Sequence, residues 1–269
     1  MTARNGLTAL ALAGAAAVAC AGGAPAPDRL DQLFAGDLRV VDLTYPVAGN
    51  IPYWPSPTGR PFSHDTLARH ASGAPSMAAY RTSEHYGTHL DAPIHFADGQ
   101  PSVDLLTAQD LFGPAVVVDV SAEAAAHPDY ALTREDLAAW EAEYGPIPQR
   151  AIVLLRTGWG VRWSDSVAYR NADARGVMHF PGFGEDAARF LVTQRDIRGI
   201  GIDNLSVDPG AADGFPAHLV VNGAGRFHLE NVANLDQLPP TGVYLLVAPI
   251  KIAGGSGGQV RLFAVLAEP

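Results

Sequence analysis

Six short apolar segments most constrain how this chain can fold. Each is rich in β-branched residues and bounded by turn residues, which is typical of buried β-strands. Two longer segments between them carry apolar residues at helical spacing. Strands that alternate with helices predict an α/β domain with a mixed sheet. The predicted strands cover 38–44, 115–120, 151–157, 198–203, 243–248 and 260–266, and the predicted helices cover 133–145 and 184–195.

The first of these helices has clear end signals. Thr133 with Asp136 three residues later forms a capping box, and Gly145 is a helix terminator. The sequence shows no internal repeat and no convincing domain boundary, and 269 residues are enough for one large domain. We therefore expect a single domain over residues 37–269.

The N-terminus differs from the rest of the chain. Residues 1–20 have a short head with one arginine, then an apolar run and small residues, which is the pattern of a signal peptide. The run is too short to span a bilayer. A buried N-terminal helix is the alternative, although its Ala and Gly content would pack poorly. Residues 21–36 read as a tether.

Cys20, the only cysteine, directly follows "AVA" at the expected processing point. It resembles the lipid-modified cysteine of bacterial lipoproteins, but Ala17 stands where leucine is usual. Lipidation of Cys20 and plain cleavage nearby both stay open. Either route predicts an exported protein, in the periplasm or at the cell surface, and a lone cysteine allows no internal disulfide.

The charge balance excludes some classes of partner. The chain has 18 Lys and Arg against 28 Asp and Glu, a formal net charge of −10, and Lys251 is its only lysine. No basic run is present. We therefore expect no nucleic-acid partner, and no membrane contact except through a lipid on Cys20.

The segment "EHYGTHLDAPIHF" gathers chemistry-bearing residues in an unusual density. His89 and Asp91 are two apart and share a face if the segment is extended. Gly87 permits a bend that could bring His85 to the same point. Imidazole with carboxylate suits Zn²⁺, and Mn²⁺ or Fe²⁺ where the carboxylate share is larger. The sequence thus predicts a metal site.

His95 follows Pro93, whose ring restricts the backbone. A neutral histidine beside a metal site can take up and return a proton near neutral pH. Upstream, Trp54 lies in a Pro/Gly-rich loop that is rigid enough to place a side chain.

At this point the sequence resembles the metal-dependent cyclase family, which includes bacterial kynurenine formamidase and isatin hydrolase. The stretch "HYGTHLDAPIHF" is similar to its His-x-Gly-Thr-His-x-Asp-x-Pro-x-His signature, and "HLVVNGAGRFHLENVANL" is similar to its second ligand segment. The resemblance implies that His85, His89 and Asp91 bind one ion, that His218 belongs to a second, that Asp91 and Glu230 bridge them, that His95 is the acid/base, and that Trp54 lines the substrate pocket.

The resemblance also implies a fold and an activity. We expect a mixed, partly barrel-like sheet flanked by helices, one or two Zn²⁺ or Mn²⁺ ions, and a homodimer. The expected reaction is hydrolysis of the C–N bond of a small aryl formamide or cyclic amide. The insert at 163–184 and the predicted export argue against N-formylkynurenine as the physiological substrate, and in length the chain is closer to the isatin hydrolase-like members.

Further residues have two readings each. His179 could reach the pocket mouth or be an ordinary loop histidine, and Asp203 and Asp208 could orient ligands or form turns. His228, two before Glu230, would share its face on a strand. The "GGSGG" stretch at 254–258 is predicted to be a flexible turn.

Two other functions stay open. A cell-surface protein could use the same fold to bind a metal or small ligand without turnover, but a binder has no need of His95. A purely structural metal site is the second, although structural zinc usually sits in cysteine-rich shells.

Overall fold

The computed structural model describes all residues except 2–28, 58, 72, 74, 268 and 269. The predicted signal peptide and Cys20 therefore lie outside the described residues. Within the segment predicted as a tether, residues Arg29–Ala35 form helix α1. None of the helices in the described part of the chain is long and apolar enough to cross a membrane.

The main sheet has eight strands in the order β1-β12-β11-β5-β7-β9-β10-β4. An additional pairing of β12 with β4 closes all of them except β1 into a barrel. Strands β5, β7, β9 and β10 are parallel, and the other pairings are antiparallel. The strands are β1 (Val40–Asp42), β4 (His89–Asp91), β5 (Phe112–Asp119), β7 (Ile152–Arg156), β9 (Gly199–Ile202), β10 (Phe227–Glu230), β11 (Val243–Pro249) and β12 (Gly257–Leu266).

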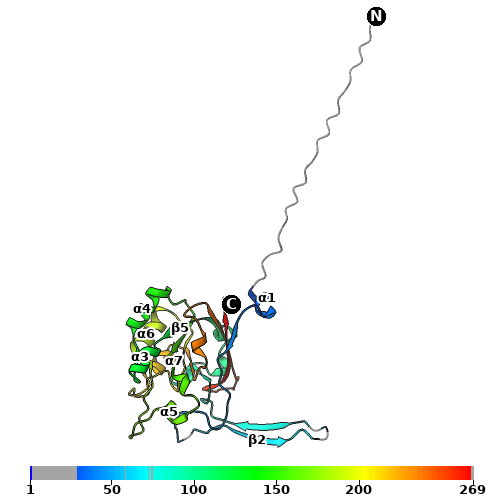
Figure 1. The fold of residues 1–269 in the computed structure, drawn as a ribbon, viewed down its shortest axis with the longest axis vertical. Helices are drawn as coiled ribbons and strands as arrows, with labels where there is room; N and C mark the ends of the chain where they lie inside the picture. The colour runs from blue at the N-terminus through cyan, green and yellow to red at the C-terminus, as the bar shows by residue number, and fades with distance from the viewer. Residues whose placement is uncertain (2–28, 58, 72, 74, 268–269) are drawn as a thin grey trace.

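Helices α3, α4 and α6 lie together on one side of the molecule (Figure 1). Helix α4 has the predicted capping box of Thr133 and Asp136 and ends at Gly145. The helices after α1 are α2 (Ala108–Leu111), α3 (Ser121–Ala126), α4 (Arg134–Tyr144), α5 (Ser166–Arg170), α6 (Glu185–Gln194) and α7 (Pro216–Gly223), and the 3-10 helices are η1 (Pro93–His95), η2 (Val103–Leu105), η3 (Trp159–Arg162) and η4 (Leu235–Gln237).

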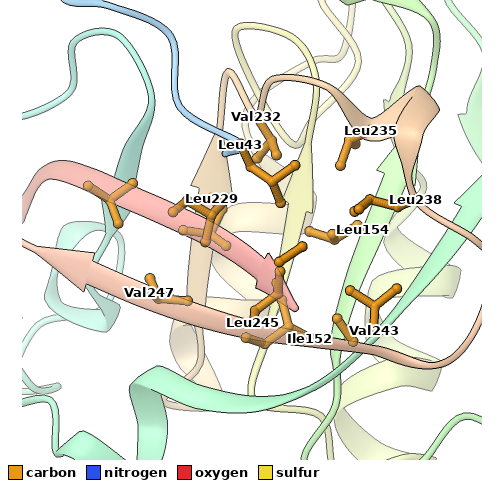
Figure 2. Packing of buried hydrophobic residues seen from close by; sticks show 14 of the residues in the cluster. Leu43, Ile152, Leu154, Leu229, Val232, Leu235, Leu238, Val243, Leu245 and Val247 are labelled. Atoms are coloured by element: carbon orange, nitrogen blue, oxygen red, sulfur yellow. The ribbon is translucent and has the colours of Figure 1, made fainter. Parts of the chain in front are cut away.

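Alternation along the strands divides the core into two. In β7, Ile152 and Leu154 belong to the cluster inside the barrel, shown in Figure 2. Their neighbours Val153 and Leu155 belong to a second cluster, which includes the buried face of α6. A central strand buried on both faces has no polar face, which explains why this stretch reads as a continuous apolar run.

All six predicted strands and both predicted helices are confirmed. Strands β4 and β10 were not predicted from the sequence. Every second residue in each is a histidine or a carboxylate, so neither forms an apolar run. The predicted flexible turn at 254–258 is wrong in its second half. Gly257 and Gly258 begin β12 and pair with Asp91 and Leu90 of β4.

Two small sheets accompany the barrel. One pairs β6 (Ala131–Leu132) with β8 (Gly182–Phe183), which lies at the end of the predicted insert. The other is a hairpin of β2 (Ser63–Ala68) and β3 (Met77–Arg81) that projects from the body (Figure 1). Every residue of β3 is exposed, including Met77 and Tyr80.

Gly182 provides a test of the packing around β8. A Cβ at this position would lie 2.3 Å from the backbone nitrogen of Pro209. We expect Gly182→Ala to reduce the free energy of unfolding by about 1–3 kcal/mol, because the backbone of residues 207–209 must move. Thermal or urea unfolding measures this loss.

The matched control is Gly223→Ala at the end of α7, where an added Cβ meets nothing within 4 Å. This variant should be as stable as the parent or slightly more stable. Equal stability of the two variants would contradict the close approach at Gly182.

Candidate metal centre

The short strand β4 aligns the predicted ligands because it lies between β10 and β12. Its His89 is opposite Glu230, and its Asp91 is opposite His228. Since side chains alternate along a strand, these four lie on one face. Leu90 and Leu229 point the other way, into the barrel. The register of three residues thus gathers the polar groups on the side opposite the core.

His85 reaches the same face from the preceding loop. Gly87 has φ +68°, which confirms the bend that the spacing predicted. The His85 Nδ1 atom lies 2.6 Å from Asp91 Oδ1. A Cβ on Gly257, which is opposite Asp91 on β12, would lie 2.7 Å from Cε1 of His85. The imidazole therefore occupies the space that a side chain at position 257 would need.

The loop that carries His85 is fixed by β12 and the residue before it. The Gln259 amide donates to the carbonyl oxygens of Ser83 and Glu84, at 2.8 and 2.9 Å. The Ser256 hydroxyl lies 3.0 Å from Nε2 of His85 and donates to Glu84 at 2.6 Å. Ser256 could not be singled out from sequence, because its role depends on a contact between distant segments.

The two carboxylate oxygens of Asp91 face different histidines. Oδ1 lies 2.6 Å from Nδ1 of His85 and 3.1 Å from Nε2 of His89. Oδ2 lies 3.5 Å from Nε2 of His218 and 3.9 Å from Nε2 of His95. Two groups able to hold a metal therefore share Asp91: one with His85 and His89, the other with His95 and His218.

Glu230 lies between the two groups. Its Oε2 is 3.4 Å from His89 Nε2, and its Oε1 is 3.4 Å from His218 Nε2. The backbone N–H of Val207 donates to Oε1 at 3.0 Å and fixes the carboxylate. Glu230 thus contacts one histidine from each group.

Asp208 orients His218. Its carboxylate lies 2.6 Å from Nδ1 of that ring, and it also accepts the backbone N–H of Ala217 at the start of α7. This arrangement leaves Nε2 of His218 facing Asp91 and Glu230. Of the two readings of Asp208, the structure supports the one in which it orients a ligand.

The electrostatics of the cluster favour a cation. Burial would lower the pKa of His89, but the carboxylates of Asp91 and Glu230 raise it to about 10. Burial would raise the pKa of Asp91, yet the neighbouring histidines hold it well below its usual value. His89 Nε2 is buried and lies 3.1 Å from Asp91 and 3.4 Å from Glu230, but it forms no well-aligned hydrogen bond among the described residues. A divalent cation would meet the same demand for positive charge, so the donor set fits such an ion.

His95 is placed by η1, which begins at Pro93, and its backbone N–H donates to the carbonyl of Ala92. Its ring stacks on His85 with centroids 3.9 Å apart. Burial lowers the pKa of His95 to about 4, so the imidazole is neutral at neutral pH.

A cavity of about 380 Å³ adjoins the cluster and has an aromatic wall. The Trp54 ring lies 5.8 Å from that of Phe215 and 6.3 Å from that of Phe180. Phe96, next to His95, packs 5.2 Å from Phe215. Trp54 thus lines the pocket that contains the cluster, together with Phe96 and Phe215, which could not be linked to it from sequence, while Phe180 packs behind Trp54.

Two other candidates lie elsewhere. The His179 ring is 2.8 Å from Asp129 and does not line the cavity, so the loop reading applies. The Asp203 carboxylate accepts the backbone N–H groups of Thr157 and Gly158, and burial raises its pKa to about 6. It fixes the turn after β7 instead of a ligand.

Comparisons with known proteins identify similar sequences and structures. The family model described as "Putative cyclase" matches residues 41–209. The isatin hydrolase of Roseibium aggregatum is 36% identical over 252 residues, which cover 87% of this chain and 94% of that protein. The kynurenine formamidase of Bacillus cereus is 31% identical over 223 residues, which cover 82% and 94%.

Among solved structures, isatin hydrolase A from Labrenzia aggregata bound to benzyl benzoate matches with a TM-score of 0.84 and 38% identity. That match covers 89% of this chain and 98% of the other. The family model matches more than half of the chain, and the relatives of 36% and 31% identity cover more than four fifths of it, so the chain belongs to the cyclase family.

Proposed function

We propose that this protein is a metal-dependent amidohydrolase that opens the C–N bond of a small aryl formamide or cyclic amide. The observation that carries the proposal is Asp91, a buried carboxylate that faces two histidine groups beside an aromatic cavity. The relatives named isatin hydrolase and kynurenine formamidase support the same reaction class.

The ligand roles follow the two groups around Asp91. His85, His89 and Asp91 would hold one Zn²⁺ or Mn²⁺ ion, and His218 would hold a second that Asp91 and Glu230 share with the first. When bound, such an ion acidifies water and polarises a carbonyl oxygen. Asp208 keeps the His218 ring oriented, and Ser256 does the same for His85.

His95 is assigned as the acid/base. Its Nε2 faces the cluster at 3.9 Å from Asp91 Oδ2, and burial lowers its pKa, which keeps the imidazole neutral with one ring nitrogen unprotonated. It takes a proton from the attacking water and returns it to the leaving nitrogen. Because His95 also lies within ligating reach of Asp91 and His218, its role must be separated from that of a ligand.

The cavity supports an aromatic substrate. Trp54, Phe96 and Phe215 line the same cavity as His95 and pack against one another, with ring centroids 5.8 and 5.2 Å apart. A flat aryl amide can pack against them, since offset and edge-to-face ring contacts are favourable. Isatin and N-formylkynurenine both meet this description.

The deciding experiment measures hydrolysis of isatin and N-formylkynurenine by absorbance, using the protein loaded with Mn²⁺ or Zn²⁺. We expect the parent to open at least one of them. His95→Ala should lower kcat by about 10²–10⁴-fold, the typical effect of losing an acid/base group, while its metal content stays that of the parent.

The matched control is His179→Ala. The His179 and His95 side chains are equally exposed, at 28%, but His179 is paired with Asp129 outside the cavity. Loss of metal from His95→Ala would make His95 a ligand instead of the proton carrier. A metal-loaded parent that hydrolyses neither compound would favour the rival reading, a binding protein without turnover.

We also propose that residues 1–20 export the protein to the periplasm or the cell surface. The support is the sequence pattern alone. When the full chain is expressed in a Gram-negative host, fractionation should place it in the envelope, and deletion of residues 2–20 should retain it in the cytoplasm. If Cys20 carries a lipid, Cys20→Ser moves the protein from the membrane fraction to the soluble envelope fraction. Equal distribution of the parent and the deletion variant would contradict export.

A homodimer is the third proposal, and the β2–β3 hairpin supports it. Two-stranded hairpins are marginally stable alone, yet this one projects with Leu67 and Tyr80 each more than 60% exposed. Residues 60–81 carry three arginines against one aspartate, whereas the chain has a net charge of −10. A basic, partly apolar arm on an acidic protein is complementary to a second copy.

Light scattering coupled to size exclusion tests this contact. The parent should be a dimer, and Leu67→Asp/Tyr80→Asp should be a monomer because charges replace the apolar contacts. Leu105→Asp changes an equally exposed leucine on η2 and should stay dimeric. A monomeric parent, or a double variant that stays dimeric, would refute the role of the hairpin.

A further inference from the structure

His228 is a buried histidine to which the proposed function gives no role. It is 0% exposed, lies on β10, and is opposite Asp91 in the register of the sheet. Its Nδ1 atom has no hydrogen-bond partner among the described residues and lies 3.9 Å from Oδ2 of Asp91. A polar ring buried without a partner is costly, so its position calls for a specific interaction.

The amide of Asn222 determines which nitrogen of His228 carries the proton. Nδ2 of Asn222 donates to the carbonyl of Arg226 at 3.0 Å, which fixes the orientation of the amide. The same Nδ2 lies 3.4 Å from Nε2 of His228. Since an amide nitrogen can only donate, Nε2 must be the acceptor. The proton of the neutral ring is therefore on Nδ1, the atom that faces Asp91.

The neighbouring ring restricts His228 further. His218 packs edge-to-face against it, with centroids 4.6 Å apart and planes at 83°. The rings of His218 and His228 both present a nitrogen to Oδ2 of Asp91. His218 approaches with the nitrogen left free by Asp208, whereas His228 approaches with the N–H that Asn222 leaves free.

We propose that His228 is a positioning residue: its Nδ1–H is directed at Oδ2 of Asp91 from 3.9 Å and, with Asn222, restrains the carboxylate shared by the two metal groups. Outer-shell donors of this kind orient a ligating carboxylate and typically account for 10–100-fold in metal affinity. The inference rests on the proposed metal centre. It adds a third residue, after Asp208 and Ser256, that acts on the centre through a ligand.

The test compares metal binding by the purified apo protein, using Co²⁺ and Zn²⁺ titrations followed by calorimetry and by the visible spectrum of Co²⁺. His228→Leu removes the donor but keeps an apolar group of similar width. We expect its metal dissociation constants to rise by about 10–100-fold. Thermal unfolding of the apo form should stay close to that of the parent, because leucine fills the buried space and only the long contacts of the ring with Asn222 and Asp91 are lost.

His228→Asn is the conservative variant. Its amide N–H can occupy the position of Nδ1, so it should recover most of the affinity lost in His228→Leu. Asn222→Leu removes the group that fixes the ring, and it should weaken binding while leaving the Co²⁺ spectrum of the loaded protein like that of the parent. Because His228 is not itself a ligand in this assignment, the Co²⁺ spectrum of loaded His228→Leu should also match that of the parent.

The outcomes separate this inference from the proposed function. A parent that binds neither Co²⁺ nor Zn²⁺ removes the metal centre itself. Parent-like affinity in His228→Leu, or lost affinity that His228→Asn does not recover, overturns the role of His228 while the metal centre stands. A changed Co²⁺ spectrum in His228→Leu would make His228 a direct ligand and would also overturn the assignment.

Discussion

The contact between the carboxylate of Asp91 and the surrounding imidazoles determines the arrangement of this molecule. Asp91 is 1% exposed, and burying a charge so completely requires partners on every side. Those partners come from the loop before β4, from η1, from α7 and from β10. The loop is held by Gln259 of β12, and β10 pairs with β4 and β9, so these contacts support both the site and the barrel.

The sequence predicted the parts of this arrangement that are local. The spacing of residues within 85–95 was enough to predict that His89 and Asp91 share a face and that the chain can bend at Gly87. The apolar strands and capped helices were predicted because each is signalled by its own residues. The assignment of His218 and Glu230 came from the resemblance to the family, since more than 120 residues separate them from the first group.

What could not be predicted depends on which distant segments meet. Ser256 and Gly257 were predicted to be part of a flexible turn. The pairing of β12 with β4 places both beside His85: Gly257 has no side chain where the imidazole lies, and the Ser256 hydroxyl contacts the ring. Phe96 and Phe215 carry no signal that separates a pocket wall from ordinary core. His228 attracted notice by its spacing from Glu230, but its tautomer depends on the amide of Asn222, which the sequence does not place.

The closure of the barrel determines when, during synthesis and folding, the predicted metal ligands come together. The strands that meet at the site, β4, β10 and β12, begin at residues 89, 227 and 257. The pairing of β12 with β4 that closes the barrel therefore cannot form until the C-terminal strand has been made. Pairings over such separations are slow to form, because the entropy of closing long loops opposes them. The complete donor set therefore does not exist on a partly made chain. A chain that crosses a membrane before it folds would take up its ion in the destination compartment, and the metal supply there would determine which ion it carries.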